Sequence, residues 1–222
     1  VYTTATGALG VATFARGSDQ LVADYDLIVK GGRVIDPSLR LNAIRDVAIT
    51  AGRISAVEAD IAGDATEVID AAGKVVVPGL IDLHTHYARD EEGPLVGLAG
   101  GVTGWVDAGS AGADEIDDMV AFARSAPQPA RMLINIGRAG ILPGGDTMDL
   151  RLADVTAAQQ AIARNRDVVV GVKARLTRGV AADDVEVLRR AQEVATSFEL
   201  PVMIHMGQTA SPLPRLLGQL KR

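Results

Sequence analysis

The sequence predicts an α/β protein in which a small β module precedes a parallel sheet. After Pro78, apolar runs of five to eight residues alternate with helix-like segments of ten to twenty residues. Such runs, with helices between them, are typical of strands buried on both faces of a parallel sheet. The aromatic content agrees, because only three Phe, three Tyr and one Trp leave the core to Val, Leu, Ile and Ala.

The first twenty residues predict a leader rather than part of a domain. Val1 to Ala15 is weakly apolar, rich in Thr, Ala and Gly, and is followed by the polar stretch RGSDQ. This pattern resembles the apolar region of an export signal, with the mild hydrophobicity of a twin-arginine signal. A disordered or helical extension is the alternative. Export to the periplasm and residence in the cytoplasm therefore both stay open.

Residues 21–77 predict part of a β-sandwich made of short strands and tight turns. Three segments are interpreted as hairpins: residues 26–36 turn at Gly31-Gly32, residues 45–59 at Ala51-Gly52 and residues 67–79 at Ala72-Gly73. Glycine supplies the positive φ that a two-residue turn needs. About 55 residues make a thin sandwich, so we expect it to need partner strands.

Residues 78–222 predict five strand–helix units. The strands are expected at 79–84, 102–109, 130–137, 167–173 and 200–205, and the main helices at 114–125, 152–166 and 181–198. Asp154 and Asp183 stand where helix N-caps are expected. The pattern fits an open doubly wound sheet or part of an eight-stranded barrel. No glycine-rich phosphate loop follows the first strand, which disfavours a nucleotide-binding domain.

Composition and charge exclude several classes of function. The chain has no cysteine, so disulfides, thiolate zinc sites and cysteine nucleophiles are excluded. Its formal charge is −6 and it has no basic run, so we expect no nucleic-acid partner. No apolar stretch approaches the roughly 18–20 residues that span a bilayer, so we expect no membrane span.

All three histidines come at the C-terminal ends of predicted strands. His84 and His86 form the motif H-T-H, and His205 ends the fifth run. Residues two apart in a strand point to the same face, so the two imidazoles of the motif converge. Strand C-termini are also where α/β barrels build active sites. A packed histidine is the usual interpretation of one such residue, but the three together predict a metal site.

Lys173, one of four lysines in the chain, ends the apolar run VVVGVK. Strand alternation places Gly171 and Lys173 on one face, and Gly171 is expected to leave room for the lysine stem. The lysine could simply extend to solvent from the strand end. Beside three histidines we favour another interpretation, in which a neutral, desolvated amine reacts with CO2 to give a carbamate that bridges two divalent ions.

Together these segments resemble a known family. VPGLIDLHTH, preceded by DLIVKGGRVIDP and VIDAAGKVV, resembles the amidohydrolase superfamily. GVTGWVDAGSAGAD, VVVGVKARL and LPVMIHMG are similar to its amidohydrolase/deacetylase group, often labelled dihydroorotase-like. The resemblance covers about residues 24–220. It implies a (β/α)8 TIM-type barrel, with about five of the eight units present here, and a small β-sandwich made from both chain ends.

The resemblance also implies a binuclear centre of two divalent metal ions, usually zinc. His84 and His86 match the pair that holds the more buried metal, Lys173 matches the carboxylated bridging lysine, and His205 matches the first histidine of the second metal. A histidine of the sixth strand and the general-base aspartate of the eighth have no counterpart. We therefore expect an N-terminal fragment, itself inactive, with the catalytic aspartate beyond residue 222.

The implied activity is hydrolysis of an amide or ester bond of a small acylated molecule by a metal-activated hydroxide. Cyclic amide hydrolysis of dihydroorotase or hydantoinase type is the alternative, as is an inactive truncated homologue. Asp107 and Asn135 could face the same mouth or serve structural roles, and Arg175 is a candidate for binding a substrate carboxylate. A homo-oligomer is compatible with the sequence.

Overall fold

A computed structural model describes residues 23–220 of the chain, which form two compact units with their boundary between Pro78 and Gly79. The expected leader at residues 1–20 lies outside the described residues. Within the described range, no helix has the length and apolar character needed to cross a membrane.

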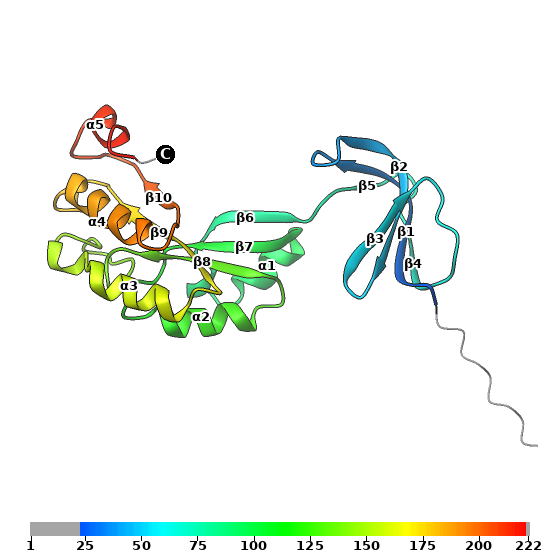
Figure 1. Ribbon diagram of the computed structural model, residues 1–222, viewed down its shortest axis with the longest axis horizontal. Helices are drawn as coiled ribbons and strands as arrows, with labels where there is room; N and C mark the ends of the chain where they lie inside the picture. The colour runs from blue at the N-terminus through cyan, green and yellow to red at the C-terminus, as the bar shows by residue number, and fades with distance from the viewer. Residues whose placement is uncertain (1–22, 221–222) are drawn as a thin grey trace, which may run out of the picture. The chain divides into compact units, whose positions relative to one another are not determined.

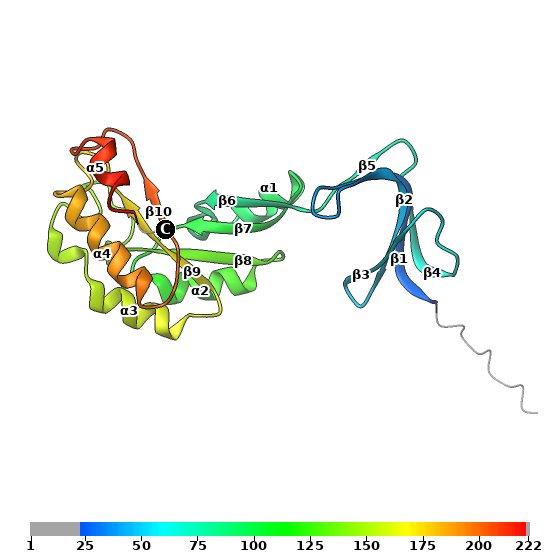
Figure 2. The same ribbon diagram turned by 45° about the horizontal axis from the view of Figure 1, so that its top comes forward.

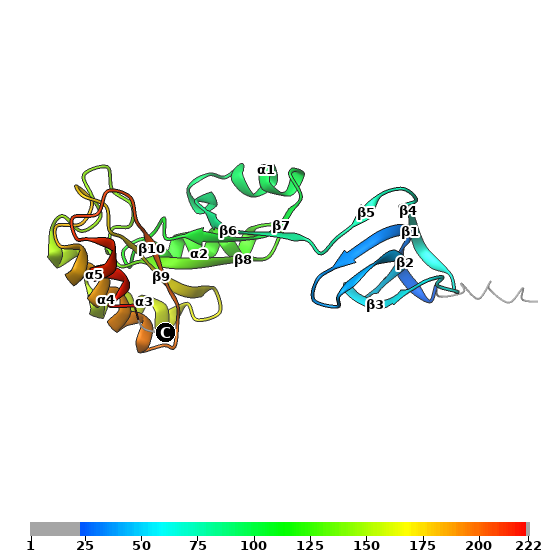
Figure 3. The same cartoon turned by 90° about the horizontal axis from the view of Figure 1, so that it is seen from above.

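The first unit is one five-stranded sheet (Figure 3). Its strands are β1 (Tyr25–Asp36), β2 (Leu41–Thr50), β3 (Arg53–Glu58), β4 (Ala65–Asp70) and β5 (Val75–Val76). The order is β3-β2-β1-β4, and β5 also pairs with β1. The long strand β1 therefore carries β2 along one edge and the two short strands β4 and β5, one after the other, along the opposite edge.

One of the three predicted hairpins is confirmed. Strands β2 and β3 are antiparallel and joined at Ala51 and Gly52, whose φ angles are 51° and 71°. Positive φ at both central residues is the requirement of a type I′ turn, whose twist matches that of the flanking strands.

The other two predicted hairpins are wrong. Strand β1 runs on through Gly31, where the register with β2 shifts and the backbone takes a φ of 70°. A glycine with positive φ can form a β-bulge as readily as a turn, and this one is fixed by a bond from Gly31 N to Asp46 Oδ1 of 2.8 Å. The chain does turn at Gly73, but β4 and β5 each pair with β1 in parallel rather than with each other.

The second unit is a curved parallel sheet whose strand order follows the sequence, β10-β9-β8-β7-β6 (Figure 1). The strands are β6 (Leu80–Thr85), β7 (Val102–Ala108), β8 (Ala130–Asn135), β9 (Val169–Arg175) and β10 (Val202–His205). All five predicted strands are present, so the expected α/β class is confirmed. The arrangement is that of part of a (β/α)8 barrel, in which each new strand adds to the same edge of the sheet.

Helices connect the strands and cover one face of this sheet. They are α1 (Gly93–Ala99), α2 (Ile116–Ser125), α3 (Val155–Arg164), α4 (Asp184–Thr196) and α5 (Leu213–Leu217), with short 3-10 turns η1 (Tyr87–Arg89) and η2 (Leu150–Leu152). Figure 2 shows α2, α3 and α4 along the same side of the strands. Both predicted N-caps are confirmed, since Asp154 accepts from Ala157 N and Asp183 from Val185 N and Glu186 N.

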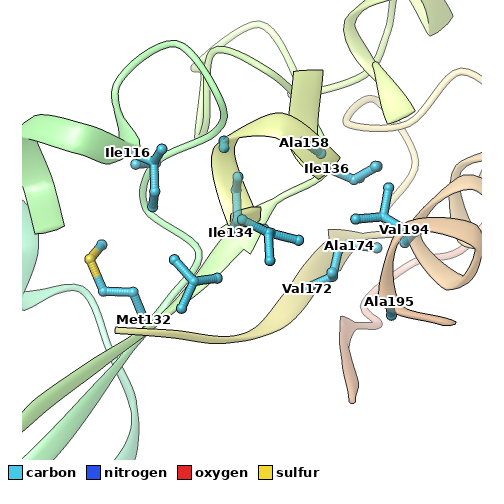
Figure 4. Packing of buried hydrophobic residues seen from close by; sticks show 14 of the residues in the cluster. Ile116, Met132, Ile134, Ile136, Ala158, Val172, Ala174, Val194 and Ala195 are labelled. Atoms are coloured by element: carbon cyan, nitrogen blue, oxygen red, sulfur yellow. The ribbon is translucent and has the colours of Figure 1, made fainter. Parts of the chain in front are cut away.

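The main hydrophobic core lies between these helices and the sheet (Figure 4). Ile134 of β8 and Val172 of β9 are fully buried there, together with Ile116 of α2. Their sequence neighbours Asn135 and Lys173 consequently point to the other face of the sheet, because side chains alternate along a strand. The core packing thus decides that Lys173 faces away from the helices.

Candidate metal centre

His84, His86 and Lys173 come together at the C-terminal edge of the parallel sheet. His84 lies in β6 and His86 directly after it, and their ring centroids are 5.8 Å apart. The Nε2 atom of His84 is 3.3 Å from Nζ of Lys173, across 89 residues of sequence. Three of the four predicted ligands therefore form one cluster, as parallel strands that end at a common edge require.

Lys173 is the buried member of the cluster. Its side chain is 1% exposed, whereas the two histidines beside it are exposed. The only bonding partners of Nζ among the described residues are His84 Nε2 and, at 3.4 Å, Met203 Sδ. Burial lowers the pKa of the amine, the charge of Arg175 lowers it further, and Asp107 and Asp146 act in the opposite direction. The surroundings therefore make the neutral amine more accessible than it is for an exposed lysine.

Room for the lysine stem comes from Gly109, in the loop after β7. A side chain there would collide with Cβ of Lys173 and lie 2.6 Å from its Cγ. Gly109 also has a φ of 80°, which few residues with a side chain adopt. The expectation that Gly171 leaves this room is wrong, since a Cβ at Gly171 would meet Leu133 and Pro201 instead.

His86 is held by a short polar chain from β7. Its Nδ1 is 2.8 Å from Oγ of Ser110, and Ser110 Oγ donates to Oδ2 of Asp107 at 2.8 Å. Burial lowers the pKa of His86, while the nearby carboxylate of Asp107 opposes that shift. A low pKa keeps the imidazole neutral, which is the form that binds metals.

Asp107 has a structural role and does not face the mouth of the sheet. Its side chain is completely buried, and its oxygens also accept from the backbone N–H groups of Ser110 at 2.7 Å and Ala88 at 3.2 Å. In register it pairs with Met132, a residue of the helix-facing core. Asp107 is therefore not a helix cap; it holds the loop after β7 and the start of η1.

His205, the fourth predicted ligand, stands slightly apart. It ends β10 beside Arg175, its register partner on β9. Within residues 23–220, no hydrogen bond or ring contact joins it to the other three predicted ligands. Burial lowers its pKa, with further lowering by the charges of Lys173 and Arg175, so His205 lies within electrostatic reach of the cluster.

The side chains present fit a metal site only if Lys173 is modified. No three His, Asp or Glu side chains of the described range lie close enough together to hold a metal ion. A buried amine without a carboxylate bonding partner fits the modification, because a carbamate would add oxygen ligands and a negative charge between the histidines. The donor set would then consist of imidazole nitrogens and carboxylate-like oxygens, which suits zinc.

Comparison with known proteins assigns the chain to a family, although no protein-family model matches it. It is 31% identical to a deacetylase of Enterococcus faecalis, covering 90% of this chain and 55% of the relative. It is 34% identical to a dihydroorotase of Syntrophotalea carbinolica over 81% of this chain and 42% of the relative. A solved adenine deaminase superposes with a TM-score of 0.80 at 30% identity, covering 90% of this chain and 55% of that structure. The chain belongs to the amidohydrolase superfamily.

The superfamily fold extends to more distant structures. An N-acyl-D-glutamate deacylase of Bordetella bronchiseptica, solved with zinc and a phosphonate inhibitor, has a TM-score of 0.61 at 20% identity, over 82% of this chain and 45% of that one. At this identity the likeness shows the fold alone. The chain spans about half the length of the curated relatives that it matches.

A second polar network in this superfamily member surrounds Arg175. Its NH1 group donates to Oδ1 of Asp146 at 2.9 Å, and Asp146 is only 1% exposed. Asp146 also accepts from Leu142 N at 3.1 Å and from Asn135 Nδ2 at 3.0 Å. Asn135 is fully buried, and its amide also donates to the carbonyl of Gly109 at 3.2 Å, so it helps to hold Asp146 in place. Arg175 keeps 21% of its side chain exposed, on the strand face that carries Lys173.

Sequence reasoning missed Gly109, Ser110 and Asp146. Ser110 had a local signal, because Asp107 stands three residues before it with a glycine between them, a pattern typical of a side chain that closes a turn. Asp146 lies in the long loop between β8 and α3, where no periodic pattern marks a functional residue. Its role is set by contacts to Arg175, 29 residues away.

Proposed function

We propose that the full-length protein is a metal-dependent hydrolase that cleaves an amide or ester bond, of deacetylase type, in a small acylated molecule. The observation that carries this proposal is the convergence of His84, His86 and the buried Lys173 at the C-terminal edge of the sheet. Membership of the amidohydrolase superfamily and the likeness to a curated deacetylase support it.

In this proposal His84 and His86 hold one divalent cation through imidazole nitrogens, and His205 contributes to a second. Zinc is the proposed metal. Bound divalent cations lower the pKa of water to near neutrality and polarise a carbonyl group. The general base is proposed to lie outside these 222 residues, because the described carboxylates near the cluster already have bonding partners. Asp107 and Asp146 each accept several hydrogen bonds, and Asp82 on β6 accepts from His84 N at 3.0 Å.

Lys173 is proposed to become a carbamate, whose oxygens would serve as ligands for the bound cations. The neutral amine attacks the carbon of CO2, so that an N–C bond forms and one C=O electron pair moves onto oxygen. The nitrogen then loses a proton to water, which leaves a carbamate with one negative charge and two oxygens. The lowered pKa of Lys173 supports this step, because only the neutral amine has the electron pair that attacks.

Arg175 is proposed to bind a carboxylate of the substrate. Asp146 engages the NH1 group and fixes the guanidinium in place, while the exposed part of the side chain faces the open edge of the sheet. A guanidinium presents several N–H donors in a plane, so one carboxylate can hold it while another is recognised. The substrate class that fits is an N-acyl or O-acyl derivative of a small acid.

Replacing His84 tests the metal site. We expect His84→Ala in the full-length protein to lose both bound metal and hydrolytic activity, because the ligands of a metal ion act together. Leu83→Ala is the matched control, since Leu83 is the exposed neighbour on the other face of β6. Elemental analysis and an ester-hydrolysis assay measure the result. An unchanged metal content in His84→Ala would remove the basis of the proposal.

Replacing Arg175 tests the substrate class. We expect Arg175→Met to raise KM for an acylated acid by about 10- to 100-fold, the range of a lost charge-assisted contact, with a smaller effect on an uncharged acyl ester. Arg178→Met, at an exposed position three residues further on, is the control for loss of one positive charge. Equal losses for the charged and uncharged substrates would contradict the role of Arg175 and leave the metal site untouched.

Cyclic amide hydrolysis is the second candidate, favoured by the identity to curated dihydroorotases. Both reactions use the same centre and differ in whether the scissile bond lies in a ring. Parallel assays of the full-length protein with acylated acids and with dihydroorotate or hydantoins distinguish them. Hydrolysis of neither set, with no metal bound, would favour an inactive homologue.

A further inference from the structure

A tight turn at the C-terminal end of β7 makes a hydrogen-bonded contact with His86. This turn consists of Asp107, Ala108, Gly109 and Ser110. Within it, the backbone N–H of Ser110 donates to Oδ1 of Asp107 at 2.7 Å. The same turn places the Ser110 hydroxyl 2.8 Å from Oδ2 of Asp107. The hydroxyl oxygen is also 2.8 Å from Nδ1 of His86. Ser110 is fully buried, so water does not compete for these bonds.

The direction of each hydrogen bond in this chain is fixed by chemistry. The single hydroxyl hydrogen of Ser110 is donated to Oδ2 of Asp107, which accepts it. The oxygen of Ser110 must then accept from the ring nitrogen, which places the proton of His86 on Nδ1. In a neutral imidazole the other nitrogen, Nε2, is left with its electron pair free.

We propose that Asp107 and Ser110 are positioning residues that hold His86 in the Nδ1-protonated form, so that Nε2 is presented as a metal ligand. This inference rests on the proposed metal site. Hydrogen bonds from the second nitrogen of a metal-binding histidine fix both its tautomer and its ring orientation. Here the outer partner is a hydroxyl that is itself held by a buried carboxylate, and the same short loop supplies Gly109, which admits the stem of Lys173.

The tautomer can be measured without any metal. We expect the ring nitrogens of His86 in the metal-free, full-length protein to show protonation at Nδ1 in 15N NMR spectra at about pH 8, above the ordinary histidine pKa of about 6.5. The spectrum of His86→Ala assigns the signals. A His86 ring protonated at Nε2 would overturn the inference, because the hydroxyl would then donate to the ring.

Ser110→Ala removes the hydroxyl and keeps the backbone bond to Asp107. We expect the affinity for zinc to fall by about 10- to 100-fold, as for other outer partners of metal ligands, and the Nδ1 preference of His86 to be lost. Thr85→Val is the matched control. Thr85 stands between the two histidines in the sequence. Its hydroxyl donates to the carbonyl of Val106 at 3.1 Å and has no bond to either ring.

The outcomes separate this inference from the proposal on which it rests. If His86→Ala keeps its metal, the proposed metal site fails. If His86→Ala loses metal while Ser110→Ala binds zinc as tightly as the unaltered protein and keeps the same tautomer, the metal site stands and the role of Asp107 and Ser110 is wrong. Circular dichroism of Ser110→Ala verifies that a lower affinity comes from a folded protein.

Discussion

Lys173→Ala is expected to reduce the hydrolytic activity of the full-length protein by more than about 100-fold. Loss of a residue that only supports a metal ligand costs up to about 100-fold, and Lys173 is proposed to supply ligand atoms itself. The variant removes the proposed source of the bridging carbamate and leaves a cavity beside Gly109. A short carboxylic acid such as acetate or propionate should restore part of the activity, because it supplies two oxygens and one negative charge to the same cavity. Initial rates against acid concentration measure the rescue.

Two controls make the result specific. Lys173→Arg keeps a long basic side chain, but its guanidinium stays protonated and does not form the carbamate, so the variant should be inactive and should gain nothing from added acid. Lys74→Ala changes an exposed lysine of the first unit and should leave activity unchanged. Near-normal activity of Lys173→Ala without any added acid would show that Lys173 is merely a buried lysine at a strand end.

The sequence was informative about the second unit for a physical reason. Its central strands are buried by helices and appear as continuous apolar runs, and the C-terminal ends of parallel strands meet at one edge. The positions of His84, His86 and Lys173 at such ends were therefore enough to predict that they lie together. His84 and Lys173 lie within the strands themselves, so their approach depends little on loop conformation, which local sequence specifies poorly.

The first unit was harder to predict because its glycines allow more than one backbone path. Gly31 and Gly73 both have positive φ, yet neither joins two paired strands. Whether such a glycine closes a hairpin or a bulge depends on which strand lies alongside, here β2 through Asp46. Pairing over long sequence separations leaves no periodic pattern within the segment itself.

The supporting residues of the site escaped prediction for a related reason. The space beside Lys173 is created by Gly109, 64 residues earlier in the chain, and not by the glycine of its own strand. Likewise Arg175 is fixed by Asp146 from a loop. Strand alternation shows which side chains share a face, but the residues that pack against that face come from neighbouring strands and loops. Only the three-dimensional arrangement identifies them.

The polypeptide of residues 1–222, produced by itself, is expected to associate with itself rather than remain a stable monomer. In the described structure β6 pairs only with β7 and β10 only with β9, so both outer strands of the sheet offer unpaired backbone groups. Edge strand β6 also exposes Leu80, Ile81 and Leu83 to 57%, 65% and 62%. Long apolar edges of this kind are templates for pairing with other chains.

Light scattering after size-exclusion chromatography, with and without added zinc and bicarbonate, measures this association. Metal binding stabilises only a folded state that offers a complete site, and this polypeptide lacks some of the proposed ligands. Added zinc should therefore not abolish the association. Ile81→Lys should reduce the apparent mass, because a charge on an edge strand opposes pairing, whereas Ile54→Lys, at an equally exposed position of the first unit, should not. A monodisperse species of 23.1 kDa with a sharp, reversible thermal transition would contradict the prediction, since it would mean that the exposed edge of β6 is stable in water.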